Sequence, residues 1–426
     1  MSPGFRAHIK QYSAAYIILV CILSRILFKL ISGINNYELF HDSYRYNEIS
    51  NRLIQGEWAM DINAYIIAPL YPLFLALIKL ISKGHWELIT VGVQFLMVGI
   101  SAVWIYRLAF LAFKSDWSAL ISVILFIFYP LTLWYNFTLV QETMFQSLFI
   151  GFLYYLYKSY NQKSNRSLYM AGLLFGLSIL TKSHALIALP FFLLWIAKYK
   201  SAGSTIGFIC IVVSICLPIT IINYQQYGTL GLSSAGTSTL FLLGHSDKTY
   251  NCILESAGTI EKRHAQGCDA DFVFEKEYPE QPYSQINKMA PIQRFKSRKE
   301  IAIKWIKENP GKFGKLKWHG IKRFVIPGLD WNQYPIKIWL PSFLLGLLIY
   351  FPALLMLLKR SHNLNQAFKY IVWILLLNIF IIFILFFPVN RFRVITLEPM
   401  LIILAGAYYS IYIKKWLQRK IPAAIT

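Results

Sequence analysis

The sequence contains little charge and few acidic residues. Charged residues make up only 15% of its 426 positions, against about 25% in soluble domains. The 20 Asp and Glu are outnumbered by 42 Lys and Arg, and 56% of all residues are hydrophobic. This composition excludes an ordinary soluble domain and predicts a membrane protein. The net charge of +22 fits basic cytoplasmic flanks and contact with anionic lipid headgroups, and no soluble basic domain indicates a nucleic-acid partner.

Cysteine is also scarce, because five residues are too few for a disulfide scaffold. Cys21, Cys210 and Cys216 lie in apolar runs, where cysteine behaves as a small buried hydrophobe. Cys252 and Cys268 fall in the one large polar region, and they could pair in an oxidising exterior or stay free thiols. Low-complexity tracts and clear internal repeats are absent from the sequence.

The N-terminus lacks the small-residue cleavage site of a secretory signal peptide. Its basic residues precede a long apolar run, which predicts an uncleaved signal-anchor that enters from the cytoplasm. Further runs long enough for a spanning helix, about 20 residues, recur along the chain. The predicted spans are 13–33, 88–113, 117–136, 138–158, 168–183, 185–198, 204–223, 338–358, 368–388 and 394–413.

An eleventh apolar run, 65–82, decides the topology. If it crossed the membrane, every basic cluster from Arg107 onward would face outside, against the positive-inside tendency. Pro69 and Pro72 interrupt its helical hydrogen bonding, so we predict a juxtamembrane or re-entrant helix at the outer interface. Ten crossings then remain, with both termini in the cytoplasm. The alternative is that 65–82 spans the membrane and the positive-inside tendency is violated.

This topology predicts a polar site at the level of the outer headgroups, built from segments that are distant in sequence. The segments on the outer face are the first outer loop 34–64 with Asp42, the turn before Glu142, the turn with Arg391 and Arg393, and the region 224–337.

Asp42 stands at the start of a predicted short amphipathic helix. Tyr46, Ile49, Leu53 and Ile54 would share one face of that helix. Aspartate is a favoured N-cap residue, so a catalytic carboxylate and a simple cap are two open interpretations of Asp42.

Glu142 stands at the start of an apolar run, in LVQETMFQSLF. A carboxylate at bilayer depth costs about 2.5–3.5 kcal/mol on insertion scales, so an acidic residue in such a run is a functional candidate. The alternative is a negative charge that the helix dipole favours at an N-terminus.

Arg391 and Arg393 lie on the predicted outer side, where topological anchoring explains them poorly. The fork of a guanidinium group can bind two oxygens of one phosphate. We therefore predict a phosphate-bearing ligand near the outer leaflet. Lys182 and His184, at the outer junction of two helices, could join this site or cap the turn, and capping is the favoured interpretation of His184.

The region 224–337 begins with a segment rich in Gly and Ser. Farther on, twelve Lys and Arg between Lys288 and Arg323 are interleaved with apolar residues. This pattern predicts one or two basic amphipathic helices on the headgroups. Simple membrane contact and a docking surface for an anionic lipid or glycan are both open.

Six segments together carry a resemblance to a known family. They are HDSYRYNEISNRLIQGEW with PLYPLFLALI, FYPLTLWYNFTLVQETMF, GLLFGLSILTKSHALIALP, LPITIINYQQYGTLGLSSAGTSTLFLLGH, NPGKFGKLKWHGIKRF and NRFRVITLEPMLIILAG. In this order they resemble the GT-C glycosyltransferases of family 39, which include lipid A aminoarabinose transferases and protein O-mannosyltransferases. The resemblance implies a polytopic fold with juxtamembrane helices, and transfer of a sugar from a polyprenyl monophosphate at the outer face of the membrane.

By this resemblance, Asp42 matches the catalytic loop aspartate and Glu142 the second acidic position, while Arg391 and Arg393 match the late basic motif. Two positions depart from the relatives. The aminoarabinose transferases have a basic residue where this chain has Ala68, and many bacterial relatives have Arg where it has Ile222. Phosphate binding would then fall more on the two late arginines and on Lys182.

We therefore predict an all-α polytopic membrane protein of the GT-C type, with about ten transmembrane helices and juxtamembrane helices in the first and the large outer loops. Residues 1–223, with the loop 34–64 and the juxtamembrane helix 65–82, would form the N-terminal module. Residues 224–337 would form a periplasmic loop region, and residues 338–426 the C-terminal transmembrane helices.

The predicted activity is transfer of a sugar from a polyprenyl-phosphate donor to a glycolipid, glycan or protein on the periplasmic face of a bacterial inner membrane, with inversion. Asp42 would be the general base and Glu142 the second catalytic carboxylate, and the two could hold a divalent cation such as Mg, Mn or Zn. Substrate-binding residues would be Arg391, Arg393, Lys182 and Tyr46. The alternatives are a lipid or glycan transporter, an O-antigen-type polymerase or ligase, and a structural scaffold.

Overall fold

The computed structural model describes residues 3–32, 42–57, 67–82, 84–228, 230–231, 241, 244–251, 254, 289, 291–329, 331, 334–358, 364–386 and 390–420. Within these residues every regular element is a helix, which confirms the predicted all-α class. Cys252 and Cys268 lie outside the described residues, as does most of the loop around them. The division of the chain at residues 223 and 337 stays a prediction.

Among these described residues, five helices are long and apolar enough to cross a membrane. They are α1 (Pro3–Ser32), α5 (Trp86–Phe113), α11 (Ala202–Tyr227), α19 (Ile336–Leu358) and α20 (Gln366–Leu385). In the same part of the chain, two bent pairs of helices bring the number to seven if each pair is one span. The pairs are α6 (Asp116–Ile127) with α7 (Pro130–Phe137), bent by 53°, and α21 (Asn390–Thr396) with α22 (Glu398–Lys420), bent by 54°.

The predicted number of about ten crossings is therefore not confirmed. In the described part of the chain, the predicted spans 138–158, 168–183 and 185–198 correspond to α8 (Glu142–Asn161), α9 (Asn165–Thr181), and the 3-10 helix η1 (Ser183–Ala188) followed by α10 (Leu189–Tyr199). α8 is long enough, but its Tyr, Gln and Asn residues reduce its hydropathy. It can carry them because most of its side chains are buried among other helices rather than in contact with lipid.

The run 65–82 forms a short helix, α4 (Leu70–Ser82), of 13 residues. At 1.5 Å per residue such a helix covers about 20 Å, less than the roughly 30 Å of a bilayer core. α4 packs against α2 (Asp42–Ile54) through Ile49, Leu53 and Ala76. The amphipathic helix predicted after Asp42 is thus present, although Ile54, predicted on its apolar face, is exposed.

A proline stands at each of the two breaks between bent helices. Tyr129 is extended ahead of Pro130, because a residue that precedes proline is disfavoured in the helical region. Pro399 stands directly after Glu398 in the first turn of α22, where its missing N–H is tolerated.

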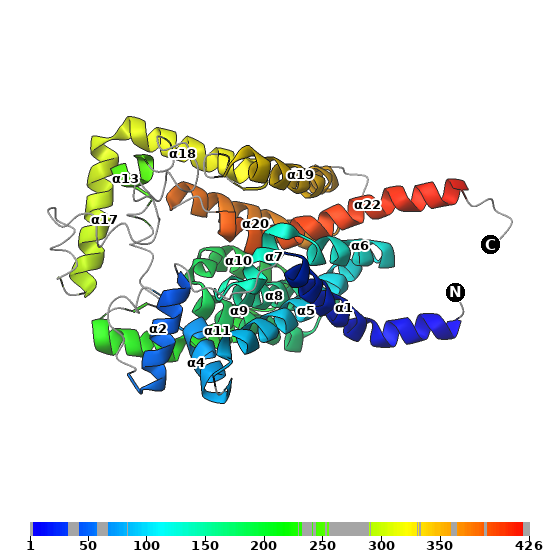
Figure 1. Ribbon diagram of the computed structural model, residues 1–426, viewed down its shortest axis with the longest axis horizontal. Helices are drawn as coiled ribbons and strands as arrows, with labels where there is room; N and C mark the ends of the chain where they lie inside the picture. The colour runs from blue at the N-terminus through cyan, green and yellow to red at the C-terminus, as the bar shows by residue number, and fades with distance from the viewer. Residues whose placement is uncertain are drawn as a thin grey trace.

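Both chain termini lie at one end of the molecule, and α2, α13 (Asp247–Tyr250) and α17 (Pro291–Glu308) lie at the other (Figure 1). This arrangement agrees with termini on one side of the membrane and the predicted polar segments on the opposite side. α18 (Pro310–Val325) packs on α20, with Phe324 and Phe380 in edge contact. The sequence predicted one or two basic amphipathic helices, and the structure has two, α17 and α18, in which Trp305 and Leu316 are buried while most of the lysines are exposed.

Candidate active site

Four charged side chains from four separate helical segments meet in one cluster. Arg391 Nη1 of α21 donates to Asp42 Oδ2 of α2 over 2.8 Å, and the same nitrogen lies 3.6 Å from Glu142 Oε1. Lys182 Nζ, at the C-terminal cap of α9, donates to that Glu142 oxygen over 2.7 Å. Two acidic and two basic residues, up to 349 positions apart in the sequence, thus form one cluster.

The cluster has an accessible side and a buried side. The Arg391 side chain is 29% exposed and that of Asp42 is 16% exposed, whereas those of Lys182 and Glu142 are 5% and 1% exposed. A ligand that arrives from outside would therefore meet the Arg391–Asp42 pair first. Lys182 and Glu142 form the floor below that pair.

Opposing effects act on the acidity of Asp42. Burial alone would raise the pKa of its carboxyl, but the attraction and hydrogen bond of Arg391, with smaller contributions from Lys182 and Arg45, lower it below its ordinary value. Asp42 is therefore a carboxylate at neutral pH. It can accept a proton or a hydrogen bond whenever Arg391 releases it.

A buried polar network holds the start of α8, where Glu142 is the first residue. Gln94 Nε2 donates to the carbonyls of Asn136 and Thr138, at 3.1 and 3.0 Å. Asn136 Nδ2 donates to Thr143 Oγ1, and the fully buried Arg25 donates to Asn136 Oδ1. These contacts fix the backbone on both sides of Glu142.

One oxygen of the buried Glu142 carboxylate has no hydrogen-bond partner among the residues that the structure describes. Glu142 Oε1 accepts from Lys182, whereas Glu142 Oε2 has no hydrogen bond from any described residue. Buried polar atoms are nearly always paired, so this oxygen is available to a donor such as a ligand hydroxyl.

A lysine fastens α2, and with it Asp42, to α4. Lys79 Nζ lies 2.6 Å from Ser50 Oγ, 2.6 Å from Asn51 Oδ1 and 2.5 Å from Asn47 Oδ1. It also stacks over the Trp86 ring at 4.5 Å. Three polar side chains of α2 thus bind the ammonium group of Lys79, a contact that was not predicted from the sequence.

Tyr46 lies one helical turn after Asp42 and is 2% exposed. Its ring meets that of Tyr71 edge to face, with the centroids 5.2 Å apart. Burial, together with the nearby charges of Asp42 and Glu142, raises the pKa of Tyr46 well above its ordinary value. Its hydroxyl is therefore a neutral group beside the cluster, and its ring is part of the α2–α4 core.

Phe392 connects the cluster with the helix junction below it. Its ring lies 5.2 Å from Lys182 Nζ, and 4.9 Å separates its centroid from that of His184. The His184 ring also packs against Phe145, at 4.7 Å. His184 thus packs between two aromatic rings, whereas capping was the role favoured from the sequence.

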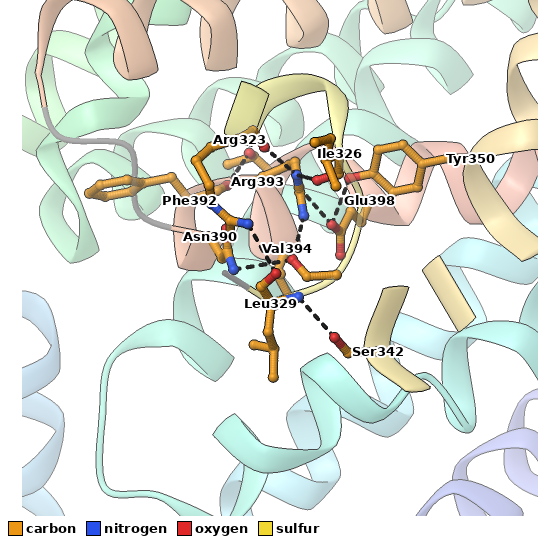
Figure 2. A network of polar contacts seen from close by, with 12 residues as sticks. Arg323, Ile326, Leu329, Ser342, Tyr350, Asn390, Phe392, Arg393, Val394 and Glu398 are labelled. Carbon is orange, nitrogen blue, oxygen red and sulfur yellow. Dashed lines mark hydrogen bonds and ion pairs between the residues drawn. The ribbon is translucent and has the colours of Figure 1, made fainter. Parts of the chain in front are cut away.

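Arg393 lies in a different environment from Arg391. Its side chain is fully buried, and its Nε donates to Glu398 Oε1 over 2.9 Å. Its other nitrogens donate to three backbone carbonyls, those of Arg323, Ile326 and Gly328 (Figure 2). The structure therefore joins Asp42, Glu142, Lys182 and Arg391, with Tyr46 beside them, and it separates Arg393 from them.

The same geometry tests whether Asp42 and Glu142 suit a divalent metal. Each carboxylate already faces a cation, since Arg391 lies between them and Lys182 binds Glu142. Among the described residues, no three His, Cys, Asp or Glu side chains come close enough to share an ion. Both carboxylates thus face cationic side chains in this arrangement, and a divalent cation at Asp42 and Glu142 stays a prediction.

Comparisons with known proteins agree with the fold. Residues 67–223 match the sequence model of a family described as dolichyl-phosphate-mannose-protein mannosyltransferase, and no curated protein matches the chain by sequence. A solved structure with a similar fold is the archaeal oligosaccharyltransferase AglB from Archaeoglobus fulgidus, in complex with an inhibitory peptide and a dolichol-phosphate.

The TM-score to AglB is 0.55 at 14% identity, and the likeness covers 98% of this chain and 53% of that one. The chain thus spans about half the length of that structure. The two likenesses confirm the resemblance to the GT-C superfamily of glycosyltransferases, and with the apolar helices they support a multi-pass membrane protein.

Proposed function

We propose that this membrane protein of the GT-C type transfers a sugar from a polyprenyl-phosphate-linked donor to an acceptor hydroxyl, with inversion, at the outer face of the membrane. The observation that carries the proposal is the cluster of Asp42, Glu142, Lys182 and Arg391. It places a carboxylate able to accept a proton beside cations able to hold a phosphate.

A lipid-phosphate donor is supported by charge and by access. Arg391 is the most exposed member of the cluster, and its guanidinium has the geometry to bind two phosphate oxygens. The solved AglB structure contains a dolichol-phosphate, which supports a ligand of this class here. Leu77, Leu80 and Ile81 of α4 are exposed, and in our proposal this apolar face borders the path of the prenyl tail.

In the proposed reaction, the acceptor hydroxyl oxygen forms a bond to the anomeric carbon of the sugar. The bond between that carbon and the donor phosphate oxygen breaks, and its electron pair leaves with the polyprenyl phosphate. The hydroxyl proton passes to Asp42. A carboxylate is a weak base, but the hydroxyl becomes acidic as the new bond forms, so transfer to Asp42 is favourable late in the step.

The Arg391–Asp42 ion pair must open for this reaction. Phosphate oxygens would take over the guanidinium of Arg391, and this exchange would free the Asp42 carboxylate for the acceptor. Arg391 would then stabilise the charge that develops on the leaving phosphate, in a site with little water. Glu142 Oε2, which has no partner among the described residues, would accept a hydrogen bond from a sugar or acceptor hydroxyl.

No step in this proposal uses a metal, because the carboxylates already have cationic partners. The acceptor class stays open among glycolipid, glycan and polypeptide hydroxyls. Location in a bacterial inner membrane with the site toward the periplasm belongs to the same proposal, supported by the position of α2, the helix that begins with Asp42, at the end opposite to both termini (Figure 1).

The proposal is tested with the full-length protein in lipid vesicles, supplied with radiolabelled polyprenyl-phosphate sugars and a membrane extract as the source of acceptors. The wild type should move label into a product, and Asp42→Asn should lose about 10²–10⁴-fold of that rate, the usual contribution of a general base. Asp247→Asn is the matched control, because Asp247 also pairs with one cation, Lys312, on an exposed surface. Wild-type rates in Asp42→Asn would rule out the proposed base.

A further inference from the structure

The helix that carries Arg391 is too short to orient itself. α21 has seven residues, and isolated helices below about 12 residues are marginal in water. Its direction must therefore come from contacts with its neighbours. A bend of 54° also separates it from α22, so it does not simply continue a longer helix.

Arg391 and Arg393 point to opposite sides of this helix. Residues two apart in an α-helix differ by about 200° around the axis. Arg391 therefore reaches α2 and α8, where it meets Asp42 and Glu142, while Arg393 enters the protein on the far side. Whatever holds Arg393 consequently sets the direction of Arg391.

Arg393 is held by the end of another helix. α18 ends at Val325, and the last carbonyls of a helix lack partners within it. Arg393 Nη1 donates to Arg323 O at 2.6 Å and to Ile326 O at 2.8 Å, and Nη2 donates to Gly328 O at 3.0 Å. A cation at a helix C-terminus is also favoured by the helix dipole.

Glu398 completes the arrangement from across the bend. Its Oε1 accepts from Arg393 Nε and from the Tyr350 hydroxyl of α19, and its Oε2 accepts from the Tyr129 hydroxyl at 2.7 Å. Arg393 and Glu398 are both 0% exposed. A buried ion pair with its polar atoms hydrogen-bonded is rigid, since any movement would leave a charge without a partner.

Asn390, at the start of α21, adds a second tie to the same turn. Its Nδ2 donates to Gly328 O at 3.1 Å, and Leu329 N in turn donates to Ser342 Oγ of α19 (Figure 2). Gln146 Nε2 of α8 donates to Val394 O. The short helix is thus fastened at several points besides the contacts of Arg391 itself.

We propose that Arg393 and Glu398 are positioning residues, which fix the direction of α21 and so hold Arg391 against Asp42 and Glu142. This role rests on the proposed function, because Arg391 is there the residue that binds the donor phosphate. The buried pair itself would contact neither donor nor acceptor. In this proposal the two arginines of the late basic motif have different roles, since Arg391 binds the ligand and Arg393 holds the helix in place.

The position of Arg391 can be followed without any substrate. The arginine reagent phenylglyoxal, with mass spectrometry of the peptide, gives the modification rate of Arg391 in the folded full-length protein. Asp42→Asn should raise that rate about tenfold, because it releases a charge-assisted hydrogen bond. The single variant Glu398→Gln should raise the modification rate of Arg391 by a similar factor. Added to Asp42→Asn, the same substitution should change this rate by less than about twofold, since the effects of coupled residues are not additive.

Two further variants separate positioning from general loosening. Trp195→Phe removes a different buried interhelical hydrogen bond, from Nε1 to Ala367 O at 2.9 Å, and should lower thermal stability without changing the Arg391 rate. Tyr350→Phe removes one hydrogen bond to Glu398 and should raise the modification rate of Arg391 less than Glu398→Gln does. If Glu398→Gln does not fold, Tyr350→Phe is used in its place. An unchanged Arg391 rate in the Glu398 and Tyr350 variants, or an equal rise in Trp195→Phe, would overturn the proposal.

The transfer assay distinguishes this inference from the function on which it rests. The single variant Glu398→Gln should transfer sugar about tenfold more slowly than the wild type. The double variant with Arg391→Ala should be less than about twofold slower than Arg391→Ala alone. If the wild type shows no transfer activity but Glu398→Gln still changes the modification rate of Arg391, the positioning role is supported and the proposed function is refuted. Equal slowing in both backgrounds would show that Glu398 acts independently of Arg391.

Discussion

Two ion pairs that begin on the same seven-residue helix differ in almost every physical respect. Arg393 and Glu398 are completely buried, and their polar atoms are hydrogen-bonded. Arg391 and Asp42 are partly exposed, and the neighbouring Glu142 keeps one oxygen without a described partner. Complete pairing is typical of a structural network, whereas an incomplete cluster with an accessible side leaves room for a ligand.

The largest expected difference between the two pairs is in stability. Glu398→Ala would leave the Arg393 charge buried without a counter-ion and should cost about 3–5 kcal/mol. Asp42→Ala should cost only about 1–2 kcal/mol, because Arg391 is still close to Glu142 and reaches solvent. Thermal unfolding of both variants in detergent measures this contrast, and equal losses would contradict it.

The turn beneath the buried pair can be strained by one methyl group. Gly328 has φ +82°, and a Cβ there would lie 2.7 Å from Phe343 N. Gly328→Ala should therefore cost about 1–3 kcal/mol and loosen the carbonyl that Arg393 and Asn390 share.

Gly314→Ala is the matched control for this turn. Gly314 lies within α18 and would meet no atom within 4 Å of a new Cβ. Its replacement should stabilise by roughly 0.5–1 kcal/mol, because alanine is the better helix former. The melting temperatures of the two variants should move in opposite directions, and a shift in the same direction would count against the strained turn.

The open pair depends on α2, which Lys79 fastens to α4. Lys79→Met keeps the length of the side chain and removes a cation that Asn47, Ser50 and Asn51 surround. We expect a loss of about 1–2 kcal/mol and slower transfer, since Asp42 would no longer be held in place. Lys304→Met is the control, because its 3.8 Å ion pair with Glu308 is exposed and such pairs contribute at most about 0.5 kcal/mol. Equal effects of the two substitutions would refute the fastening role.

The smallest expected effect is on pH dependence. The pKa of Asp42 lies below its ordinary value because Arg391 outweighs burial. Its contribution to folding is therefore present above the unfolded pKa of about 3.9 and is lost as pH falls through the lower folded value. The acidic limb of the transfer profile should lie at higher pH in Arg391→Ala than in the wild type, because the guanidinium no longer lowers the pKa of Asp42. Identical limbs in both proteins would contradict the pairing.

The sequence predicts the cluster around Asp42 and Arg391, but it does not predict the buried pair of Arg393 and Glu398. Counting basic flanks places Asp42, Glu142 and Arg391 on one side, because charge asymmetry and span length together limit the topology. Glu398 stands in the apolar segment ITLEPMLIIL, and an acidic residue in such a run signals a polar role. Its partner, however, could not be read from the sequence, since the break between α21 and α22 sets which side chains meet.

The two late arginines show the same limit. As a sequence pair they both suit phosphate, and only the helical form of α21 puts them on opposite faces. The predicted ten crossings also exceed the described helices that meet the length and hydropathy criteria, and the number stays a prediction, because a helix such as α8, enclosed by other helices, need not be apolar over its whole length.

Competition between Asp42 and a lipid phosphate for Arg391 is the claim on which the account rests. The most direct test is the affinity of a polyprenyl phosphate for the purified protein in detergent, compared among the wild type, Asp42→Asn and Arg391→Ala. Removing the competing carboxylate should tighten binding about tenfold, and removing the guanidinium should weaken it by a similar factor. Equal affinity in all three proteins, or weaker binding in Asp42→Asn, would contradict the account.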